Sequence, residues 1–188
     1  MGLLISKQMN ENEMPLRNIS FIAGNILPDI WLSFIYRPHF RKFSAAGINK
    51  MLRRLYDSRA GSGGLWFSYR LGVVTHYICD FFCYSHTPAF KGGLNGHRRY
   101  EKKQTVKAGD MLPFFKRKCT NIDYDVLIGM LNDYVSRHEQ LLNQNPEMSY
   151  TDIPVAVLAA AWTASVVYLN GCKEPVENSY KMEADCYA

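Results

Sequence analysis

The sequence predicts an all-α protein built as a single-domain, multi-helix bundle. Apolar residues recur at helical spacing along most of the chain, and the alternating pattern of a half-buried strand is hard to find. The chain has 188 residues, of which 47% are hydrophobic and 21% charged. A domain of this size can bury roughly 70% of the surface that its unfolded form exposes. We therefore expect one domain over residues 1–188, with a loose polar tail from about residue 171.

The first helical segments are separated by turn-forming residues. An initial amphipathic segment should end near the GNILPD stretch at residues 24–29, where glycine, asparagine and proline interrupt the pattern. Residues 30–36 and 43–57 are expected to form further helical pieces, because Pro38 disfavours helix at the residue before it. The Gly- and Ser-rich stretch 58–64 predicts a flexible connection.

A long and very apolar helix is expected from Leu65 to Tyr84, at the centre of the domain. It should stop near Pro88, which lacks a backbone donor. The Gly-rich loop at residues 91–96 then leads into a short basic helix at residues 97–110.

Two more helices are expected in the last third of the chain. One should run to about residue 143, capped by Asn121 or Asp123. Its apolar face is expected to contain Leu127, Met130, Leu131, Tyr134, Leu141 and Leu142. The other should begin at Thr151 or Asp152, one of which would be its cap, and should be buried to about Asn170.

Charge and cysteine content narrow the class of protein. The net charge is +5, and the basic clusters are either solvated helix faces or sites of attraction for phosphate-bearing partners. The five cysteines are odd in number and lack zinc-finger spacing, which is typical of reduced thiols. The first residues do not form a secretory signal, and the apolar stretch Ile153 to Leu169 is interpreted as a buried helix rather than a membrane span. We therefore expect a cytoplasmic protein.

Ionisable side chains recur within the apolar central segment. His76 and Asp80 are four residues apart, so they project from the same face of a helix and can hold one cation together. His97 and Glu101 repeat this spacing on the short basic helix, and His86 can turn toward that second pair.

Two further candidates lie at chain reversals. Asp29 follows Pro28, and His39 follows Pro38, so rigid backbone can aim both side chains inward. Imidazole nitrogen and carboxylate oxygen without cysteine pairs suit zinc in an open site. The candidate metal ligands are Asp29, His39, His76, Asp80, His86, His97 and Glu101.

Each candidate also has a structural interpretation. The pair on the central helix can be a buried hydrogen-bonded pair, and the pair on the basic helix a surface contact. Asp29 can be a helix cap and His39 a loop residue. We interpret His138 as a core histidine with satisfied hydrogen bonds, and Cys79 and Cys83 as small core residues.

Four motifs, taken in order, resemble the zinc-dependent phospholipase C family of bacteria, an all-α fold related to the zinc nucleases. They are AGNILPDI at 23–30, PHF at 38–40, GVVTHYICDFFCYSH at 72–86 and GHRRYE at 96–101. The resemblance implies two zinc sites, one held by Asp29, His39, His76 and Asp80, the other by His86, His97 and Glu101. Family members usually hold a third zinc through an N-terminal Trp and a nearby His. This chain has no Trp before Trp31 and no His before His39, so the sequence does not predict the third zinc site.

The resemblance predicts a metal-dependent hydrolase that cleaves phosphodiester bonds, including those of phospholipid head groups, through zinc-activated water. Asp29 would be both a ligand and the catalytic group that orients or deprotonates this water. Arg98, Arg99 and Lys102 are candidates for attracting the phosphate. The expected partners are a phosphodiester or phospholipid substrate and, transiently, a membrane surface; nucleic acid is the less favoured substrate.

Two alternatives from other classes remain. The missing N-terminal ligands favour a non-catalytic, metal-stabilised relative of these hydrolases that acts as an interaction protein. A helical bundle with inward carboxylates and histidines can also be a di-iron oxidase, although that class uses Glu-x-x-His pairs, which this sequence lacks.

Overall fold

The computed structural model describes residues 1–11, 14, 16–30, 40–58, 64–93, 95–97, 99–100, 102 and 122–171. These residues form α1 (Gly2–Glu11), α2 (Asn18–Ile30), α4 (Arg41–Tyr56), α5 (Leu65–Phe82), the 3-10 helix η1 (Tyr84–His86), α7 (Tyr124–Gln144), the 3-10 helix η2 (Pro146–Thr151) and α8 (Asp152–Gly171). Residues 95–97 and 99–100 are also helical, and no strand occurs within the described ranges. The all-α fold class is therefore confirmed. The predicted piece at 31–36, most of the basic helix and the tail from residue 172 lie outside the described residues.

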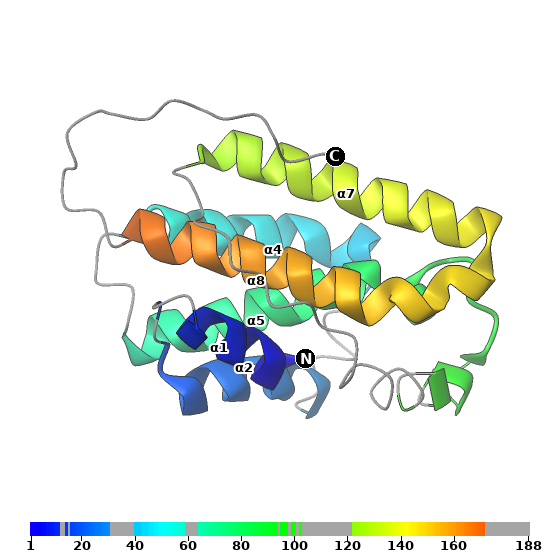
Figure 1. The fold of residues 1–188 in the computed structure, drawn as a ribbon, viewed down its shortest axis with the longest axis horizontal. Coiled ribbons are helices and arrows are strands. Elements are labelled where there is room, and N and C mark those ends of the chain that lie inside the picture. The colour runs from blue at the N-terminus through cyan, green and yellow to red at the C-terminus, as the bar shows by residue number, and fades with distance from the viewer. Residues whose placement is uncertain are drawn as a thin grey trace.

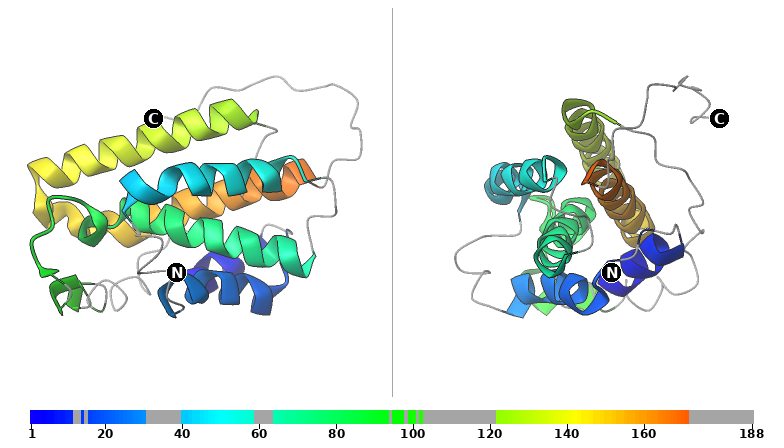
Figure 2. Two further views of the ribbon diagram at one scale, coloured as in Figure 1. Left: turned by 180° about the vertical axis from the view of Figure 1, so that it is seen from behind. Right: turned by 90° about the vertical axis from the view of Figure 1, so that its left-hand side faces the viewer.

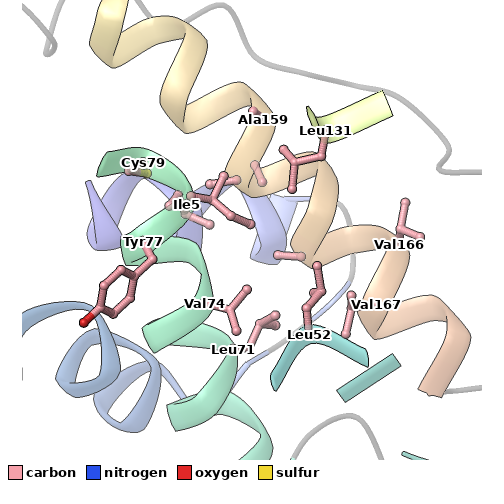
Figure 3. Close-up of a cluster of buried hydrophobic side chains, with 14 of the residues drawn as sticks. Ile5, Leu52, Leu71, Val74, Tyr77, Cys79, Leu131, Ala159, Val166 and Val167 are labelled. Carbon is pink, nitrogen blue, oxygen red and sulfur yellow. The ribbon is translucent and has the colours of Figure 1, made fainter. Parts of the chain in front are cut away.

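Helix α5 is the centre of the bundle, as expected. It packs against α2 on one side and against α4 and α8 on the other (Figures 1 and 2). Leu71 and Val74 of α5 point toward Leu52 of α4 and Val167 of α8 in the core (Figure 3). Cys79, also on α5, is a buried free thiol, so its interpretation as a core residue is confirmed. A helix that is apolar on nearly every face is stable only when buried in this way.

Glycines bring the backbones of α2 and α5 unusually close together. A Cβ atom on Gly72 would lie 2.2 Å from the carbonyl oxygen of Phe21, and one on Gly24 would lie 2.1 Å from that of Tyr69. No side chain fits at either position, so the two glycines are required for this approach. The contact fixes the middle of α2 relative to the middle of α5.

Helix α2 ends close to the GNILPD stretch, as predicted, but Gly24 and Asn25 do not interrupt it. The helix continues through Gly24 and Asn25 and ends at Ile30. Asn25 supports the helix contact instead of a turn, because its amide donates to Phe21 O at 3.1 Å and to Thr75 Oγ1 at 3.3 Å. Pro28 lies within the last turn of α2, where it lacks the N–H that would donate to the carbonyl oxygen of Gly24.

The end of α5 also differs from expectation. The helix stops at Phe82, and Cys83 is extended with φ −81° and ψ 126°. A separate 3-10 turn, η1, follows, so His86 lies on a short element of its own instead of at the end of α5. This break turns His86 back toward the helix that it follows.

Helix α7 confirms one predicted cap and corrects the predicted apolar face. The Asp123 carboxylate accepts from Asp125 N at 2.8 Å, which caps the helix. The buried residues are Tyr124, Leu127, Leu131, Val135, His138 and Leu142. Met130, Tyr134 and Leu141 are 39–48% exposed, because they flank this stripe.

Helix α8 is long and apolar enough to cross a membrane, but 67% of its most apolar stretch is buried inside the protein. It packs against α5, α1 and α4, as a core helix does. Within the described residues no other helix meets the same criteria. The helix begins at Asp152, as predicted, whereas the Thr151 hydroxyl donates back to Met148 O at 2.8 Å.

Candidate metal site

The site begins on α5, where helical spacing brings the first predicted pair together. His76 Nε2 lies 3.2 Å from Asp80 Oδ2, and both side chains are buried. The pair lies one helical turn apart on the same face, as the spacing predicts. The α-helical geometry of α5 alone accounts for this part of the site.

Asp29 joins the pair from α2. Its Oδ1 lies 3.5 Å from His76 Nε2, and its side chain is 63% exposed, against 6% for His76. The close approach of α2 and α5 at Gly24 and Gly72 makes this contact possible. Asp29 is therefore the solvent-accessible member of the group.

Asp80 links this group to a second one. Its Oδ1 lies 3.6 Å from His86 Nε2, so the two carboxylate oxygens face different imidazoles. The His86 ring lies 4.6 Å from the His97 ring, centroid to centroid, with the planes at 90°. Five predicted ligands thus form a continuous series from α2 to the helical residues 95–97. His39 and Glu101, the other two, lie outside the described residues.

The carboxylates around His76 favour positive charge at this point. Burial lowers the pKa of His76, but the charge and hydrogen bond of Asp80 raise it. The charge of Asp29 and a hydrogen bond to the backbone of Asn25 add to this effect, and the pKa rises from 6.5 to about 9. At neutral pH the imidazole is protonated between two carboxylates, and a metal ion that bound there would displace the proton.

The donor chemistry of these residues fits zinc. Bonds of about 2.0–2.2 Å in a tetrahedron separate neighbouring donor atoms by about 3.3–3.6 Å. The measured separations from His76 Nε2, 3.2 Å to Asp80 and 3.5 Å to Asp29, are close to this. However, within the part of the chain that the structure describes, no three His, Cys, Asp or Glu side chains form a group that could hold a metal ion.

Comparison with known protein families identifies the family to which the chain belongs. The family model of zinc-dependent phospholipase C matches residues 5–150. The chain belongs to this family. At family level it is therefore a zinc-dependent, phospholipase C-like hydrolase. No curated protein and no solved structure matches the chain significantly.

A second buried polar cluster is centred on Asp152 and is called the Asp152 cluster below. Asp152, at the start of α8, is fully buried, and its Oδ1 lies 2.9 Å from His138 Nε2. Its Oδ2 accepts from Tyr84 N at 2.6 Å and from the Tyr100 hydroxyl. The interpretation of His138 as a core histidine with a satisfied hydrogen bond is confirmed.

Tyr100 and the role of Asp152 were not predicted from the sequence. Burial and the charge of Asp152 raise the pKa of Tyr100 well above its ordinary value, so its hydroxyl stays protonated and donates. An acidic residue that opens an otherwise apolar helix is usually a cap, which is how Asp152 was interpreted. Its position directly before a buried stretch was the only signal of another role.

Proposed function

We propose that this protein is a zinc-dependent hydrolase of phosphodiester bonds, with phospholipid head groups as the preferred substrate class. Two sets of ligands would each hold a zinc ion, and both ions would take part in the hydrolysis. The first consists of Asp29, His39, His76 and Asp80, and the second of His86, His97 and Glu101. Membership of the zinc-dependent phospholipase C family supports the chemistry, and the geometry around Asp80 supports the residues.

The observation that carries the proposal is the position of Asp80 between two imidazoles. A buried carboxylate with one oxygen 3.2 Å from His76 and the other 3.6 Å from His86 can bridge neighbouring cations. A structural hydrogen-bonded pair needs only one imidazole. A carboxylate that faces two is better explained by a shared site.

Asp29 is the group that we assign to the attacking water. Bound zinc would lower the pKa of water toward about 7 and polarise a phosphoryl oxygen. The Asp29 carboxylate is exposed to solvent, whereas Asp80 is buried. Asp29 would therefore orient the water and accept its proton. Arg99 and Lys102 are exposed near His97 along the chain and would attract the anionic substrate.

The first test combines elemental analysis with hydrolysis of a chromogenic phosphodiester. Zinc should copurify with the protein, a chelator should abolish hydrolysis, and added zinc should restore it. Calcium added in place of zinc is the matched control and should restore nothing. Firmly bound zinc without cleavage of phosphodiesters or phospholipids would support the non-catalytic alternative instead.

An exposed apolar stripe favours a phospholipid over a soluble substrate. Ile19, Ile26 and Ile30 follow helical spacing on α2 and are 86%, 47% and 71% exposed. Asp29 lies on the same helix, so a lipid surface that covers this stripe would also be next to the candidate site. We include transient membrane contact through α2 in the proposal.

Substitution of this stripe separates lipid from soluble substrates. Ile19→Ser should lower hydrolysis of phospholipid vesicles several-fold and leave a soluble phosphodiester unaffected. Val126→Ser is the control, because Val126 is 53% exposed on α7, on the other side of the bundle from α2 (Figure 1). Equal effects of the two variants on vesicles would contradict membrane contact through α2.

A further inference from the structure

The Asp152 cluster connects four separate elements of the protein. Asp152 itself comes from α8 and His138 from α7, and their contact lies within one helical hairpin. Tyr84 begins η1, and Tyr100 belongs to the helical residues near 97. The donors are 68 and 52 residues distant from Asp152 along the chain, so these bonds join regions that local structure does not hold together.

The two distant donors are next to predicted ligands of the second set. Tyr84 lies two residues before His86 in the same 3-10 turn. Tyr100 follows His97 by three residues, which is about one helical turn. A hydrogen bond that fixes Tyr84 or Tyr100 therefore limits where the neighbouring imidazole can go.

We propose that Asp152 is a positioning residue for the second zinc set, through its bonds to Tyr84 N and the Tyr100 hydroxyl. This inference rests on the proposed function, because it assumes that His86 and His97 bind zinc. His138 completes the arrangement by holding the other carboxylate oxygen. No residue of the cluster touches the substrate in this proposal.

The surroundings explain why a polar anchor is needed here. Lys91, Gly92, Gly93, Asn95 and Arg99 are exposed, so apolar burial does little to fix this segment. The ring contact of Tyr84 and Tyr100, with centroids 6.2 Å apart, provides part of the order. The hydrogen bonds to the fully buried Asp152 carboxylate fix the orientation of the segment, because bonds to a buried charged group are strong and depend on geometry.

The first set is positioned independently of Asp152. His76 and Asp80 lie on α5, and Asp29 lies on α2, which packs on α5 through the glycine contact. Loss of the hydrogen bonds to Asp152 should therefore lower the affinity of the second set for zinc and leave the affinity of the first set unchanged. A general loss of stability would lower the zinc affinity of both sets.

The experiment measures zinc affinity of the full chain by competition with a chromophoric chelator, together with thermal unfolding of the metal-free protein. Tyr100→Phe removes only the hydroxyl that donates to Asp152. We expect one zinc ion to bind about 10- to 100-fold more weakly and the other to bind as in the parent. Asp152→Asn should have the same selective effect, and Tyr100→Phe decides if that variant does not fold.

Tyr124→Phe is the matched control. The Tyr124 hydroxyl donates to Asn49 O at 2.7 Å, far in sequence from the ligands, so its loss should lower the melting temperature without changing either zinc affinity. The inference is overturned if Tyr100→Phe binds both ions like the parent, or if Tyr124→Phe weakens zinc as much as Tyr100→Phe. A parent that binds no zinc overturns the proposed function, and this inference with it.

Discussion

The two halves of the candidate site are held in different ways. Asp29, His76 and Asp80 lie on α2 and α5, long helices whose backbones touch at paired glycines. His86 lies on the 3-10 helix η1, and His97 lies on the short helical stretch 95–97. Neither element is a continuation of α5. Their segment is tied to α7 and α8 through Asp152. One half is positioned by regular helix geometry and the other by hydrogen bonds across the chain.

This difference has consequences for how each half fails. Backbone packing is close to all-or-none, because a helix pair at this distance has no room to adjust. Hydrogen bonds on an exposed segment can be removed one at a time. Substitutions at the glycine contact between α2 and α5 should therefore affect stability and zinc binding together, whereas substitutions around Asp152 should affect one zinc site with less effect on the other.

The largest effect is expected from Asp80→Asn, because Asp80 contacts both halves. The variant loses the negative charge between His76 and His86, so both zinc ions should bind weakly. The buried imidazole of His76 would also lose a charged hydrogen-bond acceptor, which costs about 1–3 kcal/mol in the metal-free protein. Each ion that no longer binds removes about 2.7 kcal/mol at a free concentration of 100 times its Kd.

Zinc content by elemental analysis and unfolding with and without chelator measure these effects. Asp133→Asn is the control, since Asp133 forms an exposed pair with Arg137 on α7, and should change neither zinc content nor stability appreciably. Unchanged zinc content in Asp80→Asn would defeat the assignment of Asp80 as the shared ligand.

The next effect tests the glycine contact. Gly72→Ala adds a methyl group 2.2 Å from Phe21 O, so α2 and α5 must separate. We expect a loss of about 1–3 kcal/mol in the free energy of unfolding. Zinc binding by the first set should become weaker, because Asp29 moves away from His76. Zinc binding by the second set should not change.

Gly129→Ala is the counterpart on α7, where an added Cβ meets nothing within 4 Å. Alanine is the better helix former by about 0.5–1 kcal/mol, so this variant should be more stable and bind zinc normally. Equal destabilisation by the two alanine substitutions in urea unfolding would contradict the close approach of α2 and α5.

Candidate residues of both halves could be named from the sequence, but the anchoring of the second half could not be predicted. The spacing of His76 and Asp80 on an apolar helix is enough to predict their contact, because an α-helix has a fixed period. The approach of Asp29 depends on Gly24, which local rules interpret as a helix breaker. The anchoring of Tyr84 and Tyr100 depends on Asp152, more than 50 residues further on, and no local pattern encodes such a partner.

The smallest effect on stability is expected from Asp29→Asn, and it isolates the function of the first half. The side chain is 63% exposed, so the free energy of unfolding of the metal-free protein should change by less than about 0.5 kcal/mol. Hydrolysis of the chromogenic phosphodiester should fall by at least about 100-fold, because the variant loses a ligand and the general base together. Zinc titration should show a weaker first ion and an unchanged second one. Retention of full activity would remove Asp29 from the mechanism.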